Sequence, residues 1–180
     1  NSVTNDPVIR SELIVDEGDP FSTLLVKKSI NKIKGRNIFG KVDHKILPGS
    51  TNDLKVLEIS VEERATGEIM AGAGVGTDGT SFSFAVTENN WLGRGIKLKS
   101  SLNVSEAKIS GDILVINPNY KYSGNSVRAS LDVSSTDRAT SSGFKSSKTG
   151  FLLGTGFEQY ENLFISPNFT LAFEDIEVDS

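Results

Sequence analysis

The sequence contains no cysteine and only one histidine, His44. Without cysteine the chain cannot form disulfides, thiolate metal sites or a thiol nucleophile. A single histidine removes most general-base and zinc schemes, and we assign His44 no role. We therefore expect a protein that is not an enzyme and that binds no cofactor or metal.

Long apolar runs are also absent, and the net charge is modest. No segment approaches the roughly 18 consecutive apolar residues of a transmembrane helix. No signal peptide opens the chain, so we expect either a cytosolic protein or a mature or internal piece of a longer one. A net charge of −4 with 37% hydrophobic residues argues against disorder and against a nucleic-acid partner.

Composition changes along the chain. Charged residues are denser before Gly67, whereas glycine and serine are denser after it. We therefore predict a domain boundary near Gly67, at the turn "RATGE". The first part reads as helix, helix, strand, strand, with helices over 6–15 and 22–35, the second stopped by Gly35. Apolar side chains at helical or alternating spacing form its predicted core: Val26, Ile30, Ile33, Phe39, Leu57, Ile59 and Val61.

The second part has no helical periodicity. Seven runs alternate between apolar and polar residues, which is typical of an antiparallel meander. They cover residues 69–76, 82–86, 94–104, 109–116, 127–133, 151–157 and 169–173. Asp78-Gly79 is a strong signal for the first hairpin. The serine-rich stretch "SSTDRATSSGFKSSKTG" over 134–150 is predicted to be a long connection.

Two architectures explain this alternation. A soluble β-sandwich buries the apolar face in a core, whereas a membrane barrel turns it toward lipid. The run 94–104 matches the ~9–11 residues that a tilted strand needs to cross a bilayer. Aromatic residues also gather near the predicted strand ends, as in the interfacial girdles of barrels. These are Trp91, Tyr120, Tyr122, Tyr160 and Phe164.

In the barrel interpretation the strand after Trp91 has a lipid face and a wet face. Ile96, Leu98, Leu102 and Val104 face lipid, whereas Lys97, Lys99 and Asn103 face an aqueous lumen. The turn before this strand is predicted to lie at the membrane–water interface. Its residues are Asn90, Trp91, Gly93, Arg94 and Gly95. Alternatively, Trp91 is a loop tryptophan folded back over a core.

Several motifs carry a resemblance to a known family. "EGDPF", the junction "ERATG", "GVGTDGTSF", "NNWLGRG" and "INPNYKYSGNSV" occur in this order. Together they resemble the BamA family of outer-membrane protein assembly factors over nearly the whole chain. The resemblance implies an α+β POTRA domain over residues 1–67, without its first strand. It implies the first ~7 strands of a transmembrane β-barrel over 68–180, truncated at the C-terminus.

The resemblance also implies a function without bond chemistry. Members of the family insert client barrels by exposing a strand edge at a lateral seam, which adds a client strand. Here the edge strand would comprise Ile69, Met70, Ala71, Gly72, Ala73, Gly74, Val75 and Gly76. Its small side chains predict weak packing and easy opening. Alternatively, the glycines only relieve crowding inside the barrel.

The implied partners are client outer-membrane β-barrel proteins, the lipid bilayer, and accessory assembly lipoproteins bound through the POTRA domain. The implied location is the bacterial outer membrane, with the POTRA domain in the periplasm. Two other functions remain open: a translocation pore of the two-partner secretion type, and a soluble β-sandwich binding module. "NNWLGRG" and "EGDPF" favour assembly over export.

Overall fold

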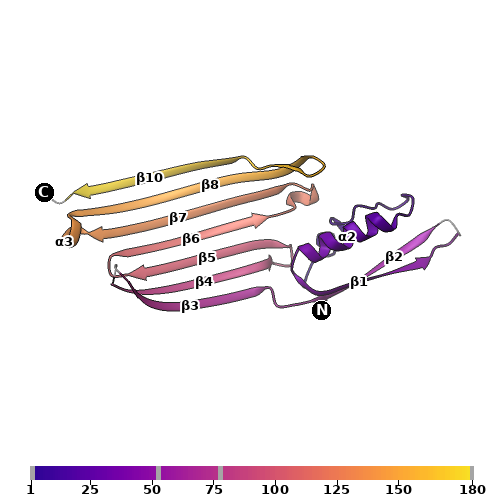
Figure 1. The fold of residues 1–180 in the computed structure, drawn as a ribbon, viewed down its shortest axis with the longest axis horizontal. Helices are drawn as coiled ribbons and strands as arrows, with labels where there is room; N and C mark the ends of the chain where they lie inside the picture. The colour runs from indigo at the N-terminus through magenta and orange to yellow at the C-terminus, as the bar shows by residue number, and fades with distance from the viewer. Residues whose placement is uncertain (1–2, 52–53, 77–78, 179–180) are drawn as a thin grey trace.

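The computed structural model describes residues 3–51, 54–76 and 79–178 (Figure 1). An N-terminal α+β unit consists of α1 (Asp6–Arg10), α2 (Thr23–Gly35), β1 (Phe39–Pro48) and β2 (Lys55–Glu63). The following strands form a meander: β3 (Gly67–Gly76), β4 (Gly79–Trp91), β5 (Ile96–Ser105), β6 (Lys108–Asn117), β7 (Ser126–Arg138), β8 (Phe144–Tyr160), β9 (Leu163–Ile165) and β10 (Asn168–Val178). Two short helices, η1 (Tyr120–Tyr122) and α3 (Ala139–Ser142), lie in its connections. In these ranges no helix is both long and apolar enough to cross a membrane.

The α+β unit has a compact apolar core. Ser22 caps α2, because its hydroxyl oxygen accepts a hydrogen bond from the Leu25 N–H at 3.4 Å. The apolar face of α2 packs on the antiparallel pair β1–β2. Among the described residues seven apolar side chains are buried: Val8, Val26, Ile30, Ile33, Ile38, Phe39 and Val42. Leu57, Ile59 and Val61 pack against them. The predicted core is confirmed, and Val8, Ile38 and Val42 join it.

One of the two predicted helix ends needs correction. The first helix ends at Arg10 rather than Val15. Beyond it, the Ile14 N–H donates to the buried Ser29 hydroxyl at 2.9 Å, a bond between this segment and α2. The second helix ends at Gly35, as predicted. The left-handed residue that follows is Asn37, with φ 60°, a conformation that asparagine tolerates better than most residues.

The meander is one antiparallel sheet in the order β3-β4-β5-β6-β7-β8-β10, with β9 pairing beside β8. Its seven long strands match the seven predicted runs, so the predicted fold class is confirmed. The long connection predicted over 134–150 is wrong, since β7 continues to Arg138 and β8 begins at Phe144. Small polar residues occupy both faces there, as in the pair Thr136↔Ser146, so apolar alternation could not reveal the strands. Of the predicted Asp78-Gly79 hairpin, Asp78 lies outside the described residues.

The sheet has one apolar and one polar face. Residues paired directly across neighbouring strands share a face. One continuous row is mostly apolar: Ile69, Val86, Ser100, Ile113, Leu131, Phe151 and Leu171. Another is polar: Gly72, Ser83, Asn103, Ser110, Ser134, Lys148 and Glu174. In the described parts of the chain, every buried apolar side chain belongs to the α+β unit. Within the described ranges no second sheet covers the meander, so this arrangement does not support the sandwich interpretation.

Candidate functional site

Strand β3 is the first edge of the sheet. It pairs with β4 alone, from Gly67↔Glu88 to Gly76↔Gly79, as the sequence predicted. Its other edge carries backbone N–H and C=O groups with no neighbouring strand in the described ranges. All ten of its residues are exposed, and Val75 reaches 87%. The predicted seam residues are therefore brought together on one open edge.

Glycine leaves the polar face of β3 almost bare. A methyl group at Gly72 would approach the Ser83 hydroxyl at 2.9 Å, which is tight. At Gly74 the nearest atom would lie at 3.5 Å, and at Gly76 no atom of the described residues would lie within 4 Å. Crowding therefore accounts for only one of these three glycines. The other two weaken the strand without any steric need.

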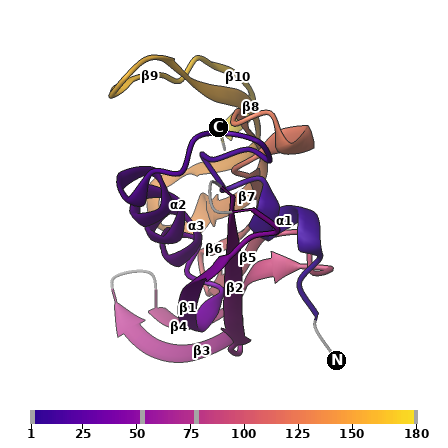
Figure 2. The ribbon, with the colours of Figure 1, turned by 90° about the vertical axis from the view of Figure 1, so that its right-hand side faces the viewer.

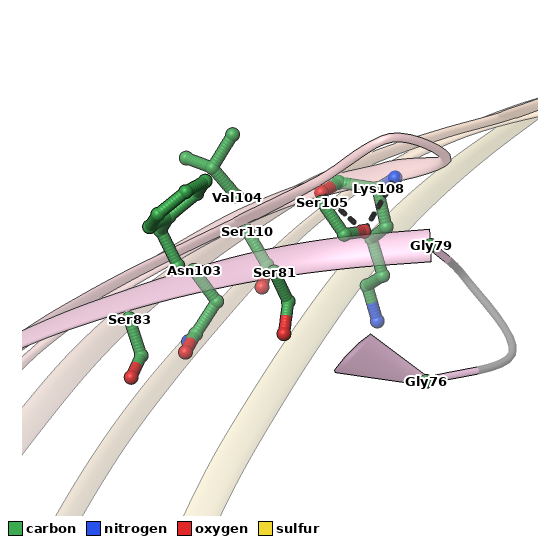
Figure 3. Close-up of a pocket in the computed structure, with 10 residues that line it drawn as sticks. Gly76, Gly79, Ser81, Ser83, Asn103, Val104, Ser105, Lys108 and Ser110 are labelled. Carbon is green, nitrogen blue, oxygen red and sulfur yellow. Dashed lines mark hydrogen bonds between the residues drawn. The ribbon is translucent and has the colours of Figure 1, made fainter. Parts of the chain in front are cut away.

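A polar hollow of about 360 Å³ lies beside the end of β3 (Figure 3). Ser81, Ser83, Asn103 and Ser110 point to the same side of the sheet, and Val104 points to the opposite side. Gly76 and Phe82 also line the hollow. The two-faced character of the strands therefore extends to the edge.

The turn that joins β4 to β5 has a left-handed backbone and a divided exposure. A one-residue bulge separates Glu88 from Trp91, and positive φ angles follow at Leu92 (55°), Gly93 (69°) and Gly95 (63°). Three residues of the motif are buried: Asn90, Gly93 and Gly95. Trp91, Leu92 and Arg94 are exposed. Trp91, 44% exposed, does not fold over a core, and its place at a membrane interface stays a prediction.

The buried half of this turn is held by the α+β unit. The Asn5 N–H donates to the Gly93 carbonyl at 2.8 Å. The Asn90 amide donates to the Thr4 hydroxyl at 2.9 Å, and its oxygen accepts from the Gly95 N–H at 2.7 Å. The Arg36 guanidinium donates to the Gly95 carbonyl at 2.9 Å. Sequence reasoning missed these contacts, although two glycines flanking one residue can signal a close backbone approach.

Three charged side chains support this interface from the α+β side. Arg36 Nε lies 3.6 Å from Glu12 Oε1, and the two side chains are only 11% and 13% exposed. Burial lowers the pKa of Arg36, and the Glu12 carboxylate opposes that shift. Glu63, at the end of β2, accepts from the Val3 N–H at 2.8 Å and the Thr4 N–H at 2.5 Å. These backbone bonds lower the pKa of Glu63.

The α+β unit also reaches the next two turns at the same end of the sheet. The Asn119 amide donates to the Ser11 hydroxyl at 3.1 Å, and Lys28 Nζ lies 3.7 Å from Glu161 Oε1. Viewed along the strands, Figure 2 shows α2 within the arc outlined by the sheet, and Figure 1 places it beyond the strand ends. The α+β unit therefore lies at one end of the strands, within the arc that the sheet outlines.

A second open site lies in the α+β unit itself. A groove of about 380 Å³ runs between β2 and the loop that precedes α2. Phe21, Leu54 and Val56 line it and are about half exposed. Within the described ranges no cluster of three or more His, Asp or Glu side chains could hold a metal ion. The β3 edge and this groove are therefore candidate binding surfaces.

The sequence and the fold both resemble known proteins, although no family profile matches the chain. It is 30% identical to the BamA of Buchnera aphidicola over 132 residues, which cover 72% of this chain and 21% of that protein. It is 26% identical to the BamA of Neisseria meningitidis over 188 residues, which cover 100% of this chain and 23% of that protein. The chain therefore spans less than a quarter of the length of these relatives.

Solved structures give the same likeness. BamA from Haemophilus ducreyi lacking POTRA domains 1–3 superimposes with a TM-score of 0.78 at 22% identity, covering 98% of this chain and 34% of that one. The chain belongs to the BamA family. CdiB from Acinetobacter baumannii is less similar, with a TM-score of 0.57 at 10% identity over 98% of this chain and 36% of that one. The BamA family therefore matches the fold better than the CdiB architecture does.

Proposed function

We propose that this chain is a segment of an outer-membrane assembly factor, which inserts client β-barrel proteins by pairing a client strand with β3. Residues 1–67 form a periplasmic POTRA domain, and residues 68–180 form the first strands of a membrane barrel. The BamA proteins similar to this chain are named outer membrane protein assembly factors, which supports this function. The proposed work is strand addition and requires no catalytic residue or cofactor.

The uncovered apolar face supports a membrane location. Large side chains on it are about half exposed, including Phe84, Leu102, Leu131 and Phe151. Soluble proteins rarely expose contiguous apolar patches of more than a few hundred Å². Strand β5 has 10 residues, which matches a tilted membrane strand. Lipid is the solvent that suits this face.

The position of β3 as the first strand of the meander, together with its glycine-rich face, is the observation that supports the proposed mechanism. A client strand placed beside β3 gains backbone hydrogen bonds worth about 0.5–1.5 kcal/mol each. Because the glycine-rich face of β3 packs weakly, a client strand can later be exchanged at modest cost. A strand that pairs with one client after another must both form and release its hydrogen bonds to the client strand easily.

The groove beside β2 is the surface we propose for accessory assembly lipoproteins. Its exposed apolar side chains, Phe21, Leu54 and Val56, lie on the α+β unit, away from the β3 edge. A partner that covers them would leave β3 free for clients. Charge reversal near the groove, at Asp19, should weaken capture of such a partner without changing strand addition.

A translocation pore is the second candidate, because CdiB shares the overall architecture. The two functions differ in their use of β3. A pore carries its client through the lumen and keeps the β3 edge closed, whereas an assembly factor must open that edge. A test of the edge therefore separates the two.

The test is a pair of neighbouring prolines in the full-length protein, in proteoliposomes that insert a client barrel. Neighbouring N–H groups on a strand point to opposite sides, so one of Ala71→Pro and Gly72→Pro removes a donor to β4 and the other removes a donor at the open edge. Ser141→Pro, in the connection between β7 and β8, is the control. The open-edge variant should lose client insertion while the β3–β4 hairpin stays intact.

Insertion at the wild-type rate in both β3 variants would refute strand addition at this edge. A loss that is equal in Ser141→Pro would point to general misfolding and would also count against the mechanism. If a secreted client still crosses the membrane in the β3 variants, the pore becomes the better description.

A further inference from the structure

We propose that Asn90 is a positioning residue that links the α+β unit to the start of β3. Through it, the placement of the α+β unit would control how firmly β3 pairs with β4. The link itself is independent of function, and its effect on client insertion rests on the function proposed above.

The first part of the link joins β2 to the turn. Thr4 is held on both sides, since its N–H donates to Glu63 at the end of β2 and its hydroxyl accepts from the Asn90 amide. Asn5 continues the same segment and donates to the Gly93 carbonyl. Residues 3–5 therefore form a strap between the α+β unit and the β4–β5 turn.

Asn90 is the centre of this arrangement. It is 6% exposed, and both ends of its side-chain amide are hydrogen-bonded. Its backbone N–H also donates to the Glu88 carboxylate at 2.7 Å. An alanine at this position would leave the Gly95 N–H without its side-chain acceptor, and a buried unpaired donor is costly.

The second part of the link joins the turn to the start of β3. Glu88 pairs directly with Gly67, the first residue of β3. A methyl group at Gly67 would lie 3.0 Å from the Glu88 carboxylate, so glycine leaves room for that side chain. Asn89 adds two bonds to the Thr66 carbonyl, at 3.1 Å from its N–H and 3.0 Å from its amide.

The linker between β2 and β3 is a second, covalent connection between the α+β unit and β3. Only residues 64–66 separate β2 from β3, and Arg64 within them donates to the Asn37 carbonyl at 2.8 Å. The covalent path and the path through Thr4 and Asn90 run side by side. The contacts of the α+β unit with Asn119 and Glu161 involve turns that do not adjoin β3. Movement of the unit therefore reaches β3 along two paths, the linker over 64–66 and the hydrogen bonds of Asn90.

The experiment measures amide hydrogen exchange and client insertion in the full-length protein in proteoliposomes. In Asn90→Ala we expect amides of residues 67–70 to exchange about tenfold faster, and client insertion to slow. Thr4→Val should have the same effect from the other side, and the double variant should add little to either. Asn103→Ala is the matched control, because its amide is exposed and makes no side-chain hydrogen bond among the described residues.

A cysteine pair tests the link by rescue. The Thr4 and Asn90 side chains are in contact, and the sequence has no other cysteine. In Thr4→Cys/Asn90→Cys we expect a disulfide to restore slow exchange at residues 67–70, and reduction to release it. A merely structural asparagine would not be rescued in this reversible way.

Several outcomes would overturn the proposal. Exchange at residues 67–70 that is alike in Asn90→Ala and Asn103→Ala would remove the link. Equal acceleration in β7 would indicate general destabilisation and also remove it. Faster exchange with unchanged insertion would keep the link but refute control of β3 during insertion. A wild-type protein that inserts no client would refute the proposed function, and the exchange data would still decide the link.

Discussion

The contact between Gly93 and the strap of residues 3–5 can be broken by a single methyl group. A Cβ at Gly93 would overlap the Val3 carbonyl oxygen, which belongs to the backbone and cannot rotate away. Gly93 also has φ 69°, where a side chain costs about 1 kcal/mol. Displacing the strap removes the bond from the Asn5 N–H, worth about another 1 kcal/mol. Gly93→Ala should therefore destabilise the docked arrangement by about 2 kcal/mol.

Gly124 provides the control for backbone strain. Its φ is 78°, and nothing lies within 4 Å of the Cβ position. Gly124→Ala should cost only about 1 kcal/mol, without effect on docking. Spin labels at Lys32 on α2 and Lys99 on β5 report the separation of the two parts in the full-length protein. The docked distance should lose population in Gly93→Ala but not in Gly124→Ala. Identical distance distributions in the two variants would refute the steric argument.

Three further outcomes follow from the packing, the charges and the two faces of the sheet. Ile33→Ala, in the fully buried centre of the core, should lower the unfolding free energy of the α+β unit by about 2–5 kcal/mol in chemical denaturation, and a loss below 1 kcal/mol would contradict the core assignment. Because its pKa is lowered in the folded protein, Glu63 should support docking fully above its unfolded pKa of about 4.3 and lose that effect as pH falls through the folded value. The docked distance in Glu63→Gln should not respond to pH in this window, and an unchanged wild-type response would exclude the carboxylate. A cysteine label at Leu102 should react with lipid-phase reagents and one at Lys99 with aqueous reagents, whereas equal reactivity would contradict a two-faced membrane sheet.

Local patterns predicted the elements that have one apolar face. In α2, the spacing of Val26, Ile30 and Ile33 and the cap at Ser22 act within a few residues, so the sequence alone reveals the helix. The same holds for β4 and β5, where strict alternation follows from an apolar and a polar face. Prediction failed where both faces are polar, as in the first half of β8.

Long-range contacts were beyond this kind of reasoning. The bond between Thr4 and Asn90 joins residues 86 positions apart, and it depends on one amide and one hydroxyl. Such a contact produces no periodic pattern of residue types in the sequence. The early end of α1 has a similar cause, because the Ser29 hydroxyl of a different helix captures the Ile14 N–H. The candidate site was therefore predicted as a strand and a turn, but not as two parts joined by the α+β unit.

The short linker over 64–66 limits the distance between the end of β2 and the start of β3. Four peptide steps separate Glu63 from Gly67, and an extended chain covers at most about 3.6 Å per step. Whatever direction the α+β unit turns, the first residue of β3 stays within about 14 Å of the end of β2. The start of β3, the first strand of the sheet, therefore stays close to β2 in every orientation of the α+β unit. Each residue inserted into the linker would lengthen this limit by at most about 3.6 Å.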